Sequence, residues 1–329
     1  MTQSSSRFAL GTFAAEGGRE FAGLVVGDRV LDLPASSRLP NSVLSILEHW
    51  DRALPELTAL AIDADRPGWR PVRGLAVRAP LRSRQVVQAG ANYRTHVIDL
   101  AVKHAEIGAG RTAEQVRAET AAMMDRRAAE GTPYLFLGQP SAIAGPYDDV
   151  VLPAYSTQHD WELELAAVIG RRAFRIGRDQ AADHIAGYTI VNDLTTRDLV
   201  FRRDMPEIGT DWLRAKNAPG FLPTGPWLVP ASFVDPGDAR VTLKLNGEVM
   251  QDESTKDMIF DVAALVAAAS QTIPLLPGDL VLTGSPAGNG LHHGRLLRPG
   301  DVMEGTITGL GVQRTRCLAE ESPEPEEPR

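Results

Sequence analysis

Beyond about residue 78 the chain is a series of short apolar segments separated by turns rich in glycine and proline. Their length and their content of β-branched residues are typical of strands. Helical patterns are few in this region, and residues 259–269 give the best one. Because parallel sheets need many crossover helices, the pattern predicts a mainly β fold with some α, antiparallel or mixed. The predicted strands are residues 150–152, 162–169, 187–191, 225–229, 241–245, 280–282 and 303–307.

The N-terminal part of the chain has a different pattern. Residues 8–33 indicate short strands, and residues 42–61 have apolar positions at near-helical spacing. A turn-rich segment at 67–71 then marks a boundary. We therefore expect a small N-terminal α/β domain over residues 1–78 and a catalytic domain over 79–318. Residues 319–329 are rich in proline and glutamate, with little to bury, and are expected to form a disordered acidic tail.

Composition excludes several classes of protein. The 34 Lys and Arg against 42 Asp and Glu give a net charge of −8, so nucleic acid is not an expected partner. Cys317 is the only cysteine, which excludes a disulfide framework or a cysteine-based metal site. No apolar run approaches the ~20 residues that cross a membrane, and the polar N-terminus does not resemble a signal peptide. A cytoplasmic location is the expectation.

One helical segment interrupts the strands, at residues 112–129 within an insertion of about 100–131. Thr112 and Gln115 have the spacing of a capping box. The predicted apolar stripe contains Ala113, Val116, Thr120, Met123 and Met124. A helix of this kind covers part of the core as a surface element, or it forms a lid over a nearby site.

Three carboxylates stand out among the strands. Glu162 and Glu164 are two residues apart in a predicted strand, so both would point to one face, about 6.5 Å apart. Asp193 ends another apolar strand. Such a cluster is costly to bury unpaired, and its oxygen ligands suit Mg²⁺, Mn²⁺ or Ca²⁺ rather than Zn²⁺. The alternative is a solvated face, or pairing with arginines such as Arg171, Arg172 and Arg197.

An ordered set of motifs resembles the fumarylacetoacetate hydrolase family. Each motif is weak alone, but together they occur in family order over roughly residues 85–316. They include Asn92-Tyr93-Arg94 before His96, and Gly284-Ser285-Pro286 near the C-terminus. The matching segments are residues 90–96, 135–137, 160–171, 190–198, 215–217, 223–229, 245–251, 257–260 and 277–288.

This resemblance implies a fold, a partner and a set of site residues. The fold is a β-roll built from a mixed, curved sheet, and the assembly is a homodimer. A divalent ion, Mg²⁺ by preference, is held by Glu162, Glu164 and Asp193. The implied catalytic residues are His96 as general base, Asp99 as its assisting acid and Lys216 beside the metal. The implied substrate-binding residues are Tyr93, Arg94, Arg197 and Ser285.

Some residues depart from the family pattern. The usual Ser-Ala-Arg-Asp is Thr195-Thr196-Arg197-Asp198, and Val200 stands where some members have glutamine. The usual Leu-Lys-Pro is replaced by residues 137–140, Leu-Gly-Gln-Pro, which removes a lysine. The helical insertion is also longer than in compact members. These changes affect the expected identity of the substrate rather than the metal site.

The combined expectation is a metal-dependent hydrolase that cleaves a C–C bond in a small 2-oxo or 2,4-dioxo acid, similar to an acylpyruvate or fumarylpyruvate. His96 and Asp99 would activate water. A decarboxylase or tautomerase of oxaloacetate, or a dienoate isomerase, could use the same site. A third reading is a metal-binding scaffold without activity, which the presence of His96 and Lys216 disfavours. Adjacent His292 and His293 are expected to be exposed rather than metal ligands.

Overall fold

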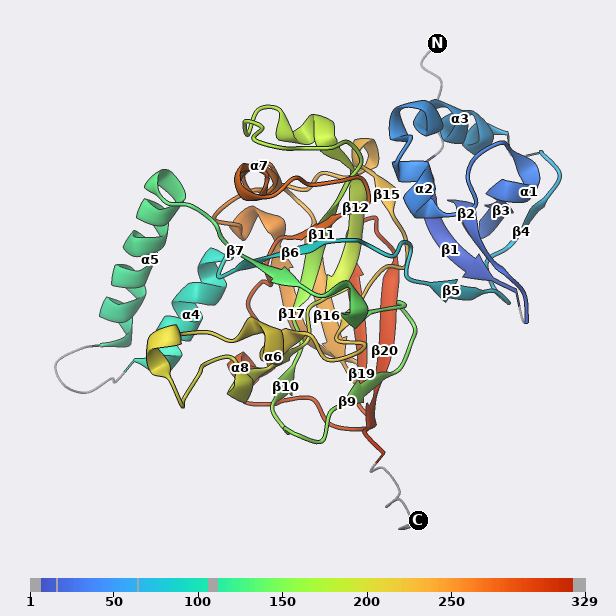
Figure 1. The fold of residues 1–329 in the computed structure, drawn as a ribbon. Helices are drawn as coiled ribbons and strands as arrows, with labels where there is room; N and C mark the ends of the chain where they lie inside the picture. Colours follow the sequence, from blue (N-terminus) through green and yellow to red (C-terminus); the bar gives the residue numbers. More distant parts are fainter. Residues whose placement is uncertain (1–6, 16, 64, 106–111, 322–329) are drawn as a thin grey trace, which may run out of the picture.

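The structure is a computed structural model that describes residues 7–15, 17–63, 65–105 and 112–321. Its N-terminal domain is a five-stranded antiparallel sheet of order β4-β3-β2-β1-β5, packed with three helices (Figure 1). The predicted helix over 42–61 is two helices, because His49 has non-helical backbone angles between them. The elements are β1 (Ala9–Ala14), β2 (Glu20–Val26), β3 (Arg29–Asp32), α1 (Leu33–Ser36), α2 (Val43–Leu47), α3 (Trp50–Ile62), β4 (Trp69–Pro71) and β5 (Ala76–Arg78).

The second domain is built on two larger sheets. One has six strands in the order β15-β12-β11-β18-β6-β7, and the other has five in the order β17-β16-β19-β20-β9. Both are mixed, since β18 pairs with β6 and β20 with β9 in parallel while the other pairs are antiparallel. The predicted mixed, mainly β architecture is therefore confirmed. The strands are β6 (Val86–Gly90), β7 (Tyr134–Gly138), β9 (Val150–Leu152), β11 (Leu163–Ile169), β12 (Ile185–Asn192), β15 (Val229–Pro230), β16 (Arg240–Leu245), β17 (Glu248–Ser254), β18 (Leu280–Leu282), β19 (Val302–Ile307) and β20 (Val312–Ala319).

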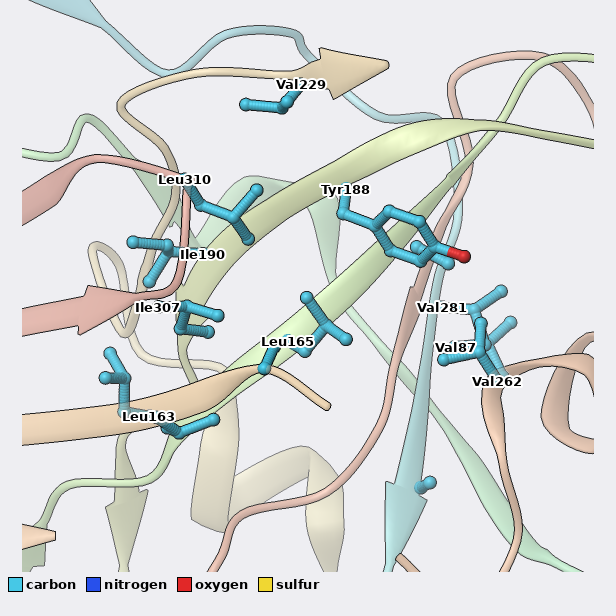
Figure 2. Close-up of a cluster of buried hydrophobic side chains, with 14 of the residues drawn as sticks. Val87, Leu163, Leu165, Tyr188, Ile190, Val229, Val262, Val281, Ile307 and Leu310 are labelled. Carbon is cyan, nitrogen blue, oxygen red and sulfur yellow. The ribbon is translucent and has the colours of Figure 1, made fainter. Parts of the chain in front are cut away.

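Strand alternation divides the core between the two faces of β11. Leu163 and Leu165 pack with Ile190 and Ile307 in one cluster (Figure 2), whereas Ala166 and Val168 belong to the other. All lie at no more than 2% exposure, so both faces of the strand are buried. Glu164, between Leu163 and Leu165, must therefore project into a buried environment on the opposite face.

Some predicted boundaries are wrong. Glu162 lies one residue before β11 rather than within it. Of the predicted strand at 225–229, only Val229 lies in a strand, β15, and Gly225 has a positive φ of 107° that is not extended. The predicted helix at 259–269 is α7 (Val262–Thr272), since the Asp261 side chain caps it by accepting a hydrogen bond from Ala264 N. Ala319, placed in the tail, is the last residue of β20, and residues 322–329 lie outside the described part.

Two helices cover one side of the larger domain, α4 (Arg94–His104) and α5 (Ala113–Glu130), and they pack against each other (Figure 1). The predicted capping box of Thr112 and Gln115 is confirmed. Val116, Thr120 and Met124 are buried, as the four-residue spacing of one helix face requires. Met123 is 47% exposed, so its place in the apolar stripe is wrong. Within the described residues, no helix is both long and apolar enough to cross a membrane.

Candidate metal and substrate site

The three predicted carboxylates meet at the ends of two neighbouring strands. β11 and β12 pair so that Leu163 lies opposite Asn192, which brings Glu162 beside Asp193. The Asp193 backbone N–H donates to the Glu162 carbonyl at 2.8 Å, and Glu162 N–H donates to the Asn192 side chain at 3.0 Å. One oxygen from each of Glu162, Glu164 and Asp193 lies within 4.8 Å of the other two. The hairpin backbone thus holds three potential ligands together.

Lys216 enters this cluster from α6 (Trp212–Lys216). Its Nζ donates to Glu162 Oε2 at 2.7 Å, Asp193 Oδ2 at 2.5 Å and Thr195 Oγ1 at 2.8 Å. Its side chain is only 3% exposed, and burial by itself would lower the pKa of the ammonium. The nearby carboxylates raise this pKa by more, so the ammonium stays charged. The implied place of Lys216 beside the metal ligands agrees with this geometry.

Arg197 contacts the other side of Glu162. Its guanidinium lies 2.7 Å from Glu162 Oε1 and donates through Nε to Asp160 Oδ2 at 2.7 Å. Asp160 is fully buried and also accepts from the backbone N–H groups of Trp161 and Gly290. Arg197 is therefore fixed between two acids. Arg197 therefore forms one of the ion pairs that the sequence offered as an alternative to a metal, here with Glu162. Arg171 pairs with Asp51 instead.

The cluster has too little positive charge nearby to offset the effect of burial on all three carboxylates. Burial raises the pKa of Glu164 well above its usual value, and the nearby Asp193 charge adds to this. It also raises the pKa of Asp193, although Lys216 acts in the opposite direction. Glu162 differs, because Lys216 and Arg197 outweigh burial and hold its pKa at about 2.

A divalent cation fits this arrangement. Asp160, Glu162, Glu164 and Asp193 carry four negative charges when ionised, and Lys216 and Arg197 carry two positive charges, which leaves −2. A bound ion of charge +2 would neutralise the remainder and allow Glu164 to ionise. The donor set is all carboxylate oxygen, which suits a hard ion.

His96 lies in the first turn of α4 and is half-buried. Burial lowers its pKa to about 4, while the charges of Glu162 and Arg197 act on it in opposite directions. The imidazole is therefore neutral near pH 7 and can accept a proton. Asp257 fixes this turn, because its carboxylate accepts from Thr95 N at 2.8 Å and from Thr95 Oγ1 at 3.0 Å.

Two predicted site residues on α4 are engaged by α5 instead. Asp99 accepts from Arg117 at 3.0 Å, and the described residues show no hydrogen bond between Asp99 and His96. Arg94 pairs with Asp125 at 2.8 Å with its side chain 42% exposed, so it lies outside the carboxylate cluster. Both side chains lie on the surface of α4 that faces α5. These ion pairs join two separate helices, so spacing within the sequence does not reveal them.

Tyr93 and Ser285, two of the implied substrate-binding residues, are buried. Burial raises the pKa of the Tyr93 phenol. Ser285 is 7% exposed and accepts from Gln251 Nε2 at 2.9 Å. Gln251 in turn accepts from Leu163 N at 3.1 Å, which ties the 285 loop to the start of β11.

Several residues that organise the site were given no role from the sequence. Glu164 accepts from Gly284 N, and Asp193 from Gln88 Nε2, both at 2.7 Å. Asn92 donates to Phe260 O at 2.9 Å and to Thr283 O at 2.8 Å, which joins three segments. The available signal was a polar side chain inside an apolar segment, as with Gln88 in β6.

Comparison with known proteins defines the class of this protein. The profile described as fumarylacetoacetate (FAA) hydrolase, C-terminal, matches residues 85–317. The chain therefore belongs to the fumarylacetoacetate hydrolase family.

Two relatives illustrate the range of activities in the family. The 2,4-didehydro-3-deoxy-L-rhamnonate hydrolase of Sphingomonas sp. (strain SKA58) is 43% identical over 186 residues, which is 55% of this chain and 64% of the relative. The mitochondrial oxaloacetate tautomerase FAHD2B of Homo sapiens is 40% identical over 183 residues, 55% of this chain and 57% of the relative. The similarity thus spans less than two thirds of each relative.

Solved structures extend the similarity to nearly the whole chain. Fumarylacetoacetate hydrolase from Exiguobacterium antarcticum has a TM-score of 0.76 at 28% identity and covers 95% of this chain and all of its own. Maleylpyruvate hydrolase from Sphingobium sp. SYK-6, solved with manganese(II) and pyruvate, has a TM-score of 0.70 at 25% identity, with the same coverage. The N-terminal domain is therefore part of the shared fold.

Proposed function

We propose that this protein is a divalent-metal-dependent hydrolase that cleaves a C–C bond in a small 2-oxo or 2,4-dioxo acid, similar to an acylpyruvate or fumarylpyruvate. The observation that carries the proposal is the buried Glu162, Glu164 and Asp193 cluster with Lys216 bonded to two of its members. A manganese and pyruvate complex of a related hydrolase supports the ligand class. Mg²⁺ is the proposed ion, with Mn²⁺ or Ca²⁺ as alternatives.

The residues have complementary roles in such a reaction. A bound divalent ion would supply Lewis-acid polarisation of the oxo acid. Lys216 adds positive charge where negative charge develops on the substrate oxygen. Neutral His96 takes a proton from water, which attacks the distal carbonyl, and base catalysis of this kind contributes roughly 10²–10⁴-fold. We assign substrate contact to Arg197 and Ser285, with Tyr93 and Arg94 as further candidates from the family resemblance.

A product assay tests this function. Purified protein with Mg²⁺ is incubated with acylpyruvates, fumarylpyruvate and oxaloacetate, and products are identified by chromatography and mass spectrometry. We expect pyruvate and a carboxylic acid from an acylpyruvate-like substrate, and no products after treatment with a chelator. Consumption of none of these acids, by protein shown to contain the metal, would contradict the proposed class.

One observation favours a tautomerase or decarboxylase as the second candidate. Asp99 is bonded to Arg117 rather than to His96, so the pair expected to activate water is not assembled. A tautomerase needs only proton transfer, and a 40% identical relative is an oxaloacetate tautomerase. Loss of the enol absorbance of oxaloacetate without new products would favour this candidate, and release of CO₂ would favour decarboxylation.

We also propose that the protein is a homodimer. β7 is an edge strand of the six-stranded sheet, and large apolar side chains are exposed on it and on neighbouring segments. Such clusters on a surface are typical of association sites. Light scattering at two protein concentrations, with Leu213→Glu as a disrupting variant, tests the proposal. The exposed side chains are Tyr134, Leu137, Phe201, Ile208 and Leu213.

A further inference from the structure

Gln88 is a polar side chain at the centre of the apolar strand β6. It is 1% exposed, and its neighbours Val86, Val87 and Ala89 are buried hydrophobic residues. An amide in such a place is costly unless its groups are hydrogen-bonded. The Gln88 amide therefore needs a hydrogen-bond partner within this apolar part of the sheet.

The amide of Gln88 is oriented by Asp193. Its Nε2 donates to Asp193 Oδ1 at 2.7 Å. An ionised carboxylate can only accept, so the amide nitrogen must face Asp193. The oxygen Oε1 is then buried without a partner among the described residues. This orientation of the amide leaves Oε1 unsatisfied. The hydrogen bond to Asp193 is therefore the interaction that determines the orientation.

Gly138 on β7 provides the space for this side chain. Gln88 lies opposite Phe136, which makes Gly138 its diagonal neighbour on the same face of the sheet. A Cβ at position 138 would lie 3.0 Å from both Cδ and Oε1 of Gln88. Gly138 does not have a positive φ, so its backbone does not require glycine. It lies in the Leu-Gly-Gln-Pro segment, where the family usually carries a lysine.

We infer that Gln88 is a positioning residue for the metal ligand Asp193, and that Gly138, which has no side chain, leaves the space that Gln88 requires. The inference rests on the proposed metal site. Gln88 holds Oδ1 of Asp193 while Lys216 holds Oδ2 at 2.5 Å, so rotation of the carboxylate breaks at least one bond. Hydrogen bonds of this kind orient ligands, and their loss typically costs 10–100-fold in metal affinity.

Manganese titration of matched variants tests the hydrogen bond itself. Gln88→Met keeps the length of the side chain but lacks the donor, so packing and hydrogen bonding are separated. We expect its Mn²⁺ affinity, measured by calorimetry, to fall roughly 10–100-fold. Gln85→Met is the control, because Gln85 donates in the same way to Asp279 at 2.7 Å, outside the site. Its Mn²⁺ affinity should equal that of the wild type.

A double-mutant cycle tests the role of Gly138. Gly138→Ala should weaken Mn²⁺ binding when Gln88 is present, because the new methyl group displaces the amide. In the Gln88→Ala background the same change should add nothing. Equal effects of Gly138→Ala in both backgrounds would show that the two residues act independently, and would overturn the pairing. Circular dichroism establishes that each variant is folded.

The outcomes separate this inference from the proposed function. Wild-type protein that binds no Mn²⁺ would contradict the metal site itself. Wild-type protein that binds Mn²⁺, together with Gln88→Met that binds it equally well, would overturn the positioning role and leave the metal site intact. If Gln88→Met does not fold, the Gly138→Ala variant decides, and unchanged affinity in that variant overturns the inference.

Discussion

Each residue around the carboxylates has a different electrostatic task. Lys216 and Arg197 keep Glu162 ionised, whereas burial raises the pKa of Glu164 and favours its protonated form. His96 is close enough to respond to Glu162 and Arg197 but is kept neutral by burial. The proposed metal ligands and the proposed proton acceptor are therefore separate groups, and they can be tested separately.

Replacing His96 with alanine should separate chemistry from metal binding. We predict that turnover falls roughly 10²–10⁴-fold, because the base is lost. Mn²⁺ affinity should remain within about twofold, because His96 is not among the clustered ligands. His49→Ala, in the N-terminal domain, is the control for a changed histidine elsewhere. Wild-type turnover of His96→Ala would remove this residue from the mechanism.

The lowered pKa of His96 has a consequence for stability. Its folded value of about 4 lies below the ~6.5 of an unfolded histidine, so between these values the unfolded chain binds the extra proton. The contribution is fully present above about pH 6.5 and is lost as the pH falls through about 4. His96→Gln should therefore lose less free energy of unfolding on acidification, by up to ~3 kcal/mol.

Urea unfolding of both proteins between about pH 7 and about pH 4 measures this difference. Titrating groups that do not interact with His96 are common to wild type and variant and cancel in the comparison. Parallel curves would mean that His96 is not held neutral by burial.

At the scale of elements, the position of His96 depends on how α4 begins. Asp257, from the segment after β17, caps the first turn through Thr95. Asp257→Ala should cost about 1 kcal/mol in stability and lower kcat by on the order of tenfold, because His96 is no longer fixed. Asp261→Ala removes a similar cap from α7 and should cost stability without lowering kcat. Equal kcat values for the two variants would contradict this positioning role.

The interpretation of α5 as a lid remains a prediction. Arg94–Asp125 and Arg117–Asp99 tie α5 to the helix that carries His96. Asp125→Arg should break the first pair, increase hydrogen exchange in α5 and raise KM a few-fold, since exposed ion pairs contribute about 0.2–1 kcal/mol. The double variant Arg94→Asp with Asp125→Arg should restore the pair and with it the hydrogen exchange of α5. A helix that never moves would give wild-type KM in the Asp125→Arg variant.

The sequence predicted those elements whose signal is local. The capping box at Thr112 and the Glu162–Glu164 spacing depend on near neighbours, and both correspond to observed features. The start of α7 was misplaced because a capping aspartate, not apolar spacing, determines it. The pairing of Asp99 with Arg117 joins two helices, and spacing within one helix cannot indicate it.

At the scale of the whole molecule, the site depends on contacts between distant segments. Strand ends from β11 and β12, the 284 loop and α6 all converge on the carboxylates. The N-terminal domain is joined to this assembly by paired backbone hydrogen bonds between Leu10 and Leu228, both at 2.8 Å. The family resemblance implied that Glu162, Glu164, Asp193 and Lys216 come together, which composition and periodicity could not; the contact of the N-terminal domain was not implied.

A metal that binds the converging segments should stabilise the whole fold. We predict that Tm rises with Mg²⁺ or Mn²⁺ concentration, by an increment that follows the logarithm of concentration over Kd. Glu164→Gln, which keeps the side-chain volume, should abolish most of the increase. Glu248→Gln, at the exposed start of β17, should retain it. Equal increases in the two variants would place the ion elsewhere.

Anomalous diffraction from crystals grown with Mn²⁺ tests the metal site most directly. We predict one peak per chain, within about 2.0–2.3 Å of oxygens from Glu162, Glu164 and Asp193, near the distances typical of hard ions. Lys216 should then lie beside the ion. A peak at another position, with Lys216 still bridging Glu162 and Asp193, would contradict the proposed metal centre.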